Sequence, residues 1–346
     1  MRPDLAALVT AQHGVFTRAQ AVEAGYTARE IRSLTREHGT WVVVRRGVYT
    51  TRALWEAADP YDGQMALRDA AVHLTTPVMH VFSHDSAARA WGLAIFRPRE
   101  QYVHLTRPVF TGSRSEHGVK HHMARIQPGE IETVNGLPVT SLVRTALDLA
   151  RAHGPMTGVT ACDSAARLGV SAQDFADALK LMVSWPGVQT ARACAAFADP
   201  GAQTVGESLT AQLLSEAGLG PRHTQFPVRV GLGTAWVDIR VGRHLIEFDG
   251  REKYLDGYGN PSDTVWEEKV RESRMVDEEF VVSRVIWPDL LGRRARAAAI
   301  ERLLRNHARS IRLYGAHLNT QQQEYAALMA AERQRRIAGF RRSDAA

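Results

Sequence analysis

Two short apolar segments joined by two residues constrain the fold of this chain more than any other feature. Residues 235–241 and 244–249 each have the alternating pattern of a β-strand, and Gly242-Arg243 separates them. A two-residue loop that begins with glycine suits a type II′ hairpin, which sets the register of its strands. Counting outward from the loop, we expect Ile239 to lie opposite Ile246.

The same register brings acidic side chains together. Asp238 falls opposite Glu247, and Asp249 shares their face of the sheet. Facing carboxylates have Cβ atoms about 5 Å apart, and like charges so placed destabilise a sheet. A divalent cation would offset the repulsion, because Mg²⁺ or Mn²⁺ takes oxygen ligands and needs only one or two carboxylates beside water and phosphate.

A helix that ends at Gly218 precedes the hairpin and carries a further acid, Glu207, at the edge of its apolar face. We therefore predict a metal site. The expected metal ligands are Glu207, Asp238, Glu247 and Asp249. The alternative is a solvated strand face with ordinary alternation of charge.

These acids belong to a longer pattern. Lys253-Tyr254 follows the second strand, a charged helix spans 267–274, and residues 281–290 read as a closing strand and loop. Over residues 203–305 this pattern resembles the restriction-endonuclease-like PD-(D/E)XK superfamily, and within it the Vsr-like, DUF559-type branch. The resemblance implies that Asp238 and Glu247 bind the metal and that Glu207 is the accessory acid of the first helix.

The chain departs from that superfamily at one catalytic position. The usual lysine two residues after the glutamate is Asp249 here. The electrophilic role therefore passes to Lys253 or Lys269, or it is absent. As alternatives, Lys253 is a solvated turn charge and Lys269 one of the charges along its helix. An inactive, degenerate site would show the same loss.

The first fifty residues predict a winged helix. Thr17–Gln20 and Thr27–Glu30 are capping-box patterns, which satisfy the free amides at two helix starts. The second helix is basic, as in a helix-turn-helix, and residues 41–49 read as two strands joined by a tight turn. The residues expected to contact the DNA groove or phosphates are Arg29, Arg32, Ser33, Arg36, Arg45 and Arg46. A winged helix that contacts protein instead is the alternative.

The segment after the winged helix mixes short strands with alanine-rich helices. Its motifs are Ser83–Ala88 with Trp91-Gly92-Leu93, and Gly136–Thr140 with Arg144–Asp148. With the winged helix, they make the first 150 residues resemble the AbiEi-type antitoxin family. That resemblance implies binding to duplex DNA and a setting in toxin–antitoxin operons or phage defence.

Three other patterns carry weaker hypotheses. Ser83-His84-Asp85 contains the residue types of a serine triad, but adjacent side chains do not generally converge. His117, His121 and His122 lack partnering acids or cysteines, so we interpret them as a polar strand edge. The Arg-rich stretch 293–342 predicts a solvated helix face, or alternatively an auxiliary nucleic-acid contact.

Length and composition limit the fold class, the number of domains and the kind of partner. The 346 residues predict an α+β multidomain protein. The expected domains are a winged helix (1–58), a mixed α/β and helical linking domain (59–200), a nuclease-like domain (201–310) and a basic helical tail (311–346). A net charge of +6 favours a polyanionic partner. Two cysteines and no long apolar segment predict a cytoplasmic protein without a membrane span.

These patterns lead to one main hypothesis and two alternatives. The main hypothesis is a Mg²⁺- or Mn²⁺-dependent DNA endonuclease that a winged helix directs to duplex DNA, in a host-defence setting. The first alternative is a DNA-binding regulator or antitoxin with an inactive nuclease-like domain and a toxin or defence partner. The second is a structural adaptor that binds another protein. The sequence leaves open whether the protein is a homodimer.

Overall fold

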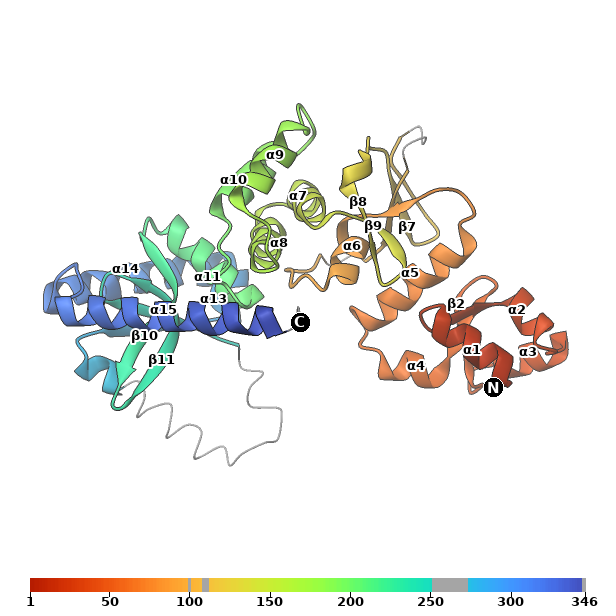
Figure 1. Cartoon of the computed structure of the whole chain (residues 1–346), viewed down its shortest axis with the longest axis horizontal. Coiled ribbons are helices and arrows are strands. Elements are labelled where there is room, and N and C mark those ends of the chain that lie inside the picture. Colours follow the sequence, from red (N-terminus) through yellow and green to blue (C-terminus); the bar gives the residue numbers. More distant parts are fainter. Residues whose placement is uncertain (99–100, 108–111, 251–272, 344–346) are drawn as a thin grey trace. The chain divides into compact units, whose positions relative to one another are not determined.

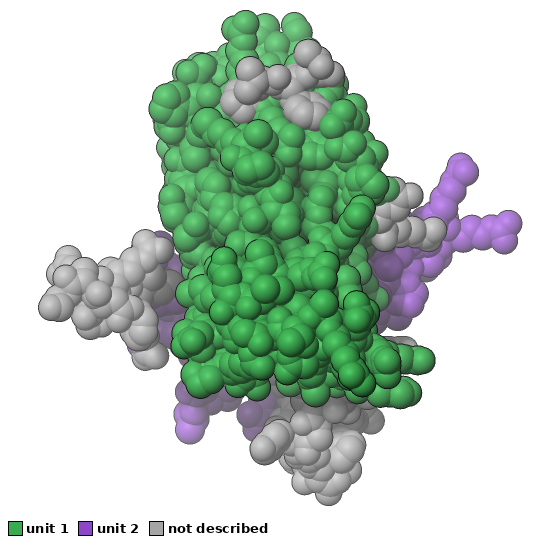
Figure 2. Space-filling view, turned by 90° about the vertical axis from the view of Figure 1, so that its right-hand side faces the viewer, with its two compact units in different colours: residues 1–165, 169–197 green, residues 166–168, 198–346 purple. Residues whose placement is uncertain are grey.

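The structure is a computed structural model, and it describes residues 1–98, 101–107, 112–250 and 273–343, with side chains as far as 335 (Figure 1). Its contacts divide the chain into two compact units. Unit 1 comprises residues 1–165 and 169–197, and unit 2 comprises residues 166–168 and 198–346 (Figure 2). None of the described helices is long and apolar enough to cross a membrane.

The N-terminal segment of unit 1 is built around two capped helices. Thr17 and Thr27 each accept a hydrogen bond from the backbone N–H three residues later, and the side chains of Gln20 and Glu30 accept one in return. Both predicted capping boxes are thereby confirmed. They start α2 (Arg18–Glu23) and α3 (Ala28–Leu34).

Further elements complete a winged-helix arrangement, including a first helix and strand that the sequence patterns do not predict. The three strands pair in the order β1-β3-β2, with β3 antiparallel to both neighbours. Phe16 and Trp41 pack edge to face at 4.7 Å between ring centroids in the core below the helices. The additional elements are α1 (Pro3–Ala11), β1 (Val15–Thr17), β2 (Trp41–Arg45) and β3 (Val48–Thr51).

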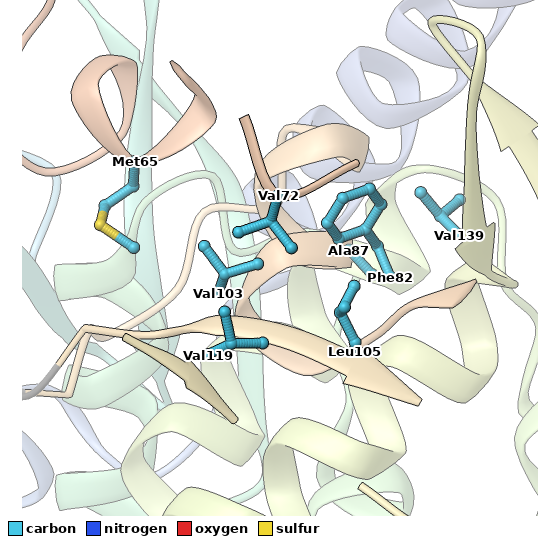
Figure 3. Packing of buried hydrophobic residues seen from close by; sticks show 8 residues of the cluster. All are labelled: Met65, Val72, Phe82, Ala87, Val103, Leu105, Val119 and Val139. Carbon is cyan, nitrogen blue, oxygen red and sulfur yellow. The ribbon is translucent and has the colours of Figure 1, made fainter. Parts of the chain in front are cut away.

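The rest of unit 1 consists of helices and a six-stranded sheet, whose strands have the order β6-β7-β5-β4-β9-β8. Figure 3 shows apolar side chains of this sheet packed with Met65 and Val72, which come from α5. The strands are β4 (Val81–Phe82), β5 (Val103–Thr106), β6 (Arg114–Glu116), β7 (Val119–His122), β8 (Ile131–Val134) and β9 (Leu137–Thr140). The helices are α4 (Arg52–Ala57), α5 (Gly63–Thr75), α6 (His84–Trp91), the short η1 (Pro128–Glu130), α7 (Leu142–His153), α8 (Pro155–Arg167), α9 (Ala172–Lys180) and α10 (Val188–Phe197).

Unit 2 has a four-stranded sheet in the order β10-β11-β12-β13, in which β12 and β13 are parallel and the other pairs are antiparallel. Helix α11 packs against β11 and β12, and α14 against β12 and β13. The strands are β10 (Arg222–Val230), β11 (Gly233–Val241), β12 (His244–Asp249) and β13 (Val281–Ile286). The helices are α11 (Val205–Glu216), α13 (Trp287–Leu291), α14 (Arg293–Tyr314) and α15 (Thr320–Ser343).

The C-terminal helix α15 contacts the sheet of unit 2. The hydroxyl groups of Tyr325 and Thr234 lie 2.6 Å apart, and the Arg333 guanidinium stacks over the Trp236 ring at 4.5 Å. The helical prediction for this stretch is therefore confirmed. The predicted solvated face is present, because most described side chains of α15 are exposed, while other side chains of the helix contact β10 and β11.

Candidate nucleic-acid interface and carboxylate site

Helix α3 presents a basic face to solvent. Arg29, Arg32 and Ser33 are exposed, whereas Ile31 is buried in the core of the winged helix. One apolar anchor therefore orients three of the predicted DNA contacts outward. Such a face on the second helix of a helix-turn-helix is the part that enters the major groove of DNA.

Arg2 holds the turn that leads into this helix. Its guanidinium donates to the Ala24 carbonyl at 2.9 Å and to a Glu30 carboxylate oxygen at 3.3 Å, and it lies 4.3 Å from the Tyr26 ring centroid. Gly25 between the helices has φ +86°, a conformation that favours glycine. A Cβ at Gly25 would lie 2.4 Å from Arg2 Nη1, so another residue type would displace the Arg2 guanidinium from this position.

The remaining predicted DNA contacts differ in position and exposure. Arg36 is exposed but lies beyond the end of α3 at Leu34, so it is not on the second helix as the sequence predicts. Arg46 is exposed at the tip of the wing, in the turn between β2 and β3. Arg45 is half-buried, and its Nη1 atom is buried without a hydrogen-bond partner among the described residues.

In unit 2, the β11–β12 hairpin has the expected register. Ile239 pairs with Ile246, and Gly242 at the turn has φ +59°. Asp238 and Glu247 are the next residues outward on each strand. The Asp238 carboxylate accepts a hydrogen bond of 2.8 Å from the Phe248 backbone N–H, so one of its oxygens is already engaged with the neighbouring strand.

Glu207 is engaged by its own helix start rather than directed at the other acids. It is buried, and its carboxylate accepts hydrogen bonds from the Gln203 backbone at 2.9 Å, the Thr204 hydroxyl at 3.0 Å and the Gln225 amide at 3.2 Å. These bonds satisfy most of its acceptor capacity. Its predicted role as an accessory metal ligand would require some of them to break.

The four predicted metal ligands do not form a ready-made site of three or more. Among the described residues, the group of that size whose ligand atoms lie within 4.8 Å of one another consists of histidines in unit 1. Glu247 is buried, whereas Asp238 and Asp249 are half-buried. Lys253 and Lys269, the predicted electrophiles, lie outside the described residues.

The structure corrects the prediction that His121 and His122 form a polar strand edge. Strand β7 lies between β6 and β5, so His121 and His122 are not on a sheet edge, and His121 is buried. His122 meets His84 and His104, which come from two other segments. Ser83, His84 and Asp85 do not act as a triad, because Asp85 bonds to His104 and His153 instead. Sequence spacing could not reveal a cluster assembled from three segments.

Comparison with known proteins identifies the N-terminal segment. Residues 3–51 match the family model described as a transcriptional regulator, AbiEi antitoxin. The match ends with strand β3, so it covers the winged helix. A crystal structure of the RV2827C protein from Mycobacterium tuberculosis is similar, with 16% identity and a TM-score of 0.35 over 60% of this chain and 79% of that chain. No curated protein matches the chain.

This N-terminal segment is therefore an AbiEi-type antitoxin or transcriptional-regulator domain, joined to further α/β structure. The family match ends at residue 51, so it covers neither residues 52–150 nor the nuclease resemblance of residues 203–305. Those two resemblances stay predictions.

Proposed function

We propose that this protein is a DNA-binding transcriptional regulator of the antitoxin type. The supporting observation is that the family match and the winged helix coincide over residues 3–51, with Arg29 and Arg32 exposed on the second helix of the motif. In this proposal α3 enters the major groove of duplex DNA and Arg46 on the wing contacts phosphate. The partner that such a regulator restrains would be a toxin protein.

The test compares two double variants with equal loss of charge. Arg29→Ala/Arg32→Ala removes two exposed arginines three positions apart on α3. Arg309→Ala/Arg312→Ala removes two exposed arginines with the same spacing on α14. Fluorescence anisotropy would measure the Kd for duplex DNA from upstream of the protein's own gene and for an unrelated duplex.

We expect the α3 variant to lose at least about tenfold in affinity for the upstream duplex, since each base or phosphate contact contributes about 1–3 kcal/mol. The α14 variant should retain its affinity. Equal losses in both would contradict the proposal, because they would indicate attraction to net charge alone.

A metal-dependent nuclease activity of unit 2 is a second candidate function. It is supported by the pairing of β11 and β12, in which Asp238 and Glu247 directly follow the last pair from the turn, Ile239 and Ile246, and by α11 packed against both strands. Two carboxylates suffice for Mg²⁺ when water and phosphate complete the shell. The bonds made by Glu207 do not fit a third protein ligand, so this proposal involves only the pair.

Purified protein would be incubated with supercoiled, linear, mismatched and single-stranded DNA in Mg²⁺, Mn²⁺ or EDTA. Glu247→Gln keeps the size of the side chain and removes its charge. Cleavage that requires the metal and is lost in this variant would support the nuclease. If no substrate were cleaved but duplex DNA were bound tightly, the nuclease would be excluded and the regulator would remain as the proposed function.

A further inference from the structure

A histidine cluster in unit 1 belongs to neither proposed function. His104 on β5 and His122 on β7 lie on adjacent parallel strands, and His84 begins α6, which packs against β5. One ring nitrogen from each of the three lies within 4.8 Å of the others. His84 and His104 are buried, while His122 is half-buried and so leaves a route to solvent.

The spacing of these nitrogens suits one metal ion. His104 Nδ1 and His122 Nε2 lie 3.0 Å apart, and the rings of His84 and His122 stack with centroids 3.8 Å apart. Zinc–nitrogen bonds of about 2.0–2.1 Å in a tetrahedron separate two ligand nitrogens by roughly 3.3 Å. Shared coordination would require the His104–His122 hydrogen bond to break and one of the stacked rings of His84 and His122 to turn, so that the nitrogen lone pairs converge on one ion.

The surroundings orient the rings as in known metal sites. His104 Nε2, the nitrogen directed away from the cluster, lies 3.3 Å from an Asp85 carboxylate oxygen, which also binds His153 Nε2 at 2.7 Å. His84 Nδ1 lies 3.0 Å from the Ser83 hydroxyl. A carboxylate on the far nitrogen of a metal-binding histidine sets the tautomer and makes the imidazole a better ligand.

A further observation accords with a ligand-binding role. His84 has φ +48°, a conformation that costs a residue other than glycine about 1–3 kcal/mol and that clusters at functional sites. Lys120 opposes a cation at the site, and Asp85 favours one.

We propose that His84, His104 and His122 bind a zinc ion, with Asp85 as the positioning residue for His104. Imidazole ligands suit zinc, as they suit copper, iron and nickel. Three protein ligands would leave the fourth tetrahedral position open to water or to a small anion, as in zinc sites that bind or transform a ligand.

The test uses untagged, metal-free, full-length protein. Isothermal titration with Zn²⁺ would measure stoichiometry and Kd, and Co²⁺ would serve as a spectroscopic probe, because four-coordinate Co²⁺ absorbs visible light strongly. The variants are His122→Gln and, as a matched control, His73→Gln. His73 is also half-buried, and its Nδ1 lies 3.0 Å from His80 Nε2. This distance equals that between His104 Nδ1 and His122 Nε2, but His73 and His80 form a pair rather than a group of three.

Wild type and His73→Gln should each bind a single zinc ion and give the four-coordinate Co²⁺ spectrum, whereas His122→Gln should give neither. Asp85→Asn should keep the spectrum but weaken zinc binding by about 10- to 100-fold. If His122→Gln fails to fold, the Co²⁺ spectrum of the wild type and the zinc affinity of Asp85→Asn still test the proposal. The proposal would be overturned if wild-type protein bound no zinc or did not give the four-coordinate Co²⁺ spectrum. It would also be overturned if His122→Gln and His73→Gln lost zinc affinity equally.

Discussion

Among single residues, His244 on β12 links the stability of unit 2 to pH. Its side chain is fully buried, Nε2 lies 2.8 Å from the Ser283 hydroxyl, and burial lowers its pKa to about 4 from 6.5. Folding therefore favours the neutral imidazole. The stabilisation is complete above the unfolded-state pKa of about 6.5 and is lost as the pH falls toward 4.

We expect the loss between those pH values to be on the order of 3 kcal/mol for this group. In His244→Gln the amide can still meet Ser283 but does not titrate, so stability should depend less on pH. Hydrogen exchange of the β12 amides at pH 7 and pH 5, corrected for intrinsic exchange rates, measures the local free energy. The same decrease in both proteins would show that His244 is not the titrating group.

Gly206 on α11, beside the predicted accessory acid, lies against the Phe248 ring of β12. A Cβ there would lie 2.0 Å from Phe248 Cε1, and the Phe248 ring is confined by Trp287 with centroids 5.0 Å apart. Alanine would favour the helix by up to about 1 kcal/mol. Overpacking outweighs this gain where the neighbour cannot move away.

Gly206→Ala should therefore lower the free energy of unfolding by about 1–3 kcal/mol. Gly129→Ala is the control, because Gly129 is exposed in η1 and its Cβ would have nothing within 4 Å. Urea unfolding followed by circular dichroism would compare the two variants. An unchanged or higher midpoint for Gly206→Ala would mean that the Phe248 ring gives way.

Among elements, polar contacts join α6 to β9 and α7 to η1. The Trp91 indole N–H donates to the Thr140 carbonyl at 2.9 Å. Arg144 is 2% exposed and bonds to Asp148 at 2.7 Å and to Glu130 at 2.9 Å. Apart from Glu130, these residues belong to the motifs that resemble the antitoxin family, and here they have a structural role.

Replacing Arg144 by alanine leaves Asp148, which is 1% exposed, with Arg151 as its remaining ion-pair partner among the described residues. We expect a loss of about 3–5 kcal/mol in stability. The contrasting variant is Lys180→Ala, which breaks the exposed Lys180–Asp177 pair of 2.6 Å and should change stability by less than about 1 kcal/mol. Similar thermal midpoints for the two variants would contradict this difference between buried and exposed pairs.

At the scale of the whole molecule, charge and the division into units both bear on function. The chain carries 43 Lys and Arg against 37 Asp and Glu. The candidate DNA contacts and the histidine cluster lie in unit 1, whereas the carboxylates lie in unit 2. DNA binding through phosphates releases counterions, so affinity should fall as salt rises.

We expect log K for duplex DNA to decrease linearly with log salt concentration. The slope should become less steep by about one for each arginine removed from α3, provided that arginine contacts phosphate. Anisotropy titrations over a range of salt concentrations for Arg32→Ala and Arg309→Ala provide the comparison. An affinity of wild type that is insensitive to salt would favour the protein-binding adaptor.

The sequence by itself determined the local elements of this protein. The capping boxes at Thr17 and Thr27, the wing turn at Gly47 and the hairpin at Gly242 all occur as predicted. Capping and turn geometry act between residues a few positions apart, so their patterns are legible without the fold. Strand β1, with only three residues, was too short to carry such a pattern.

Only the tertiary structure decided which distant side chains meet. His84, His104 and His122 come from three segments, and the parallel pairing of β5 with β7 brings two of them together. The register of the hairpin was predictable, but the hydrogen bonds of Asp238 and Glu207 were not. Those bonds depend on which backbone amide or side chain approaches from another element, and that approach is settled only by the packing of the whole unit.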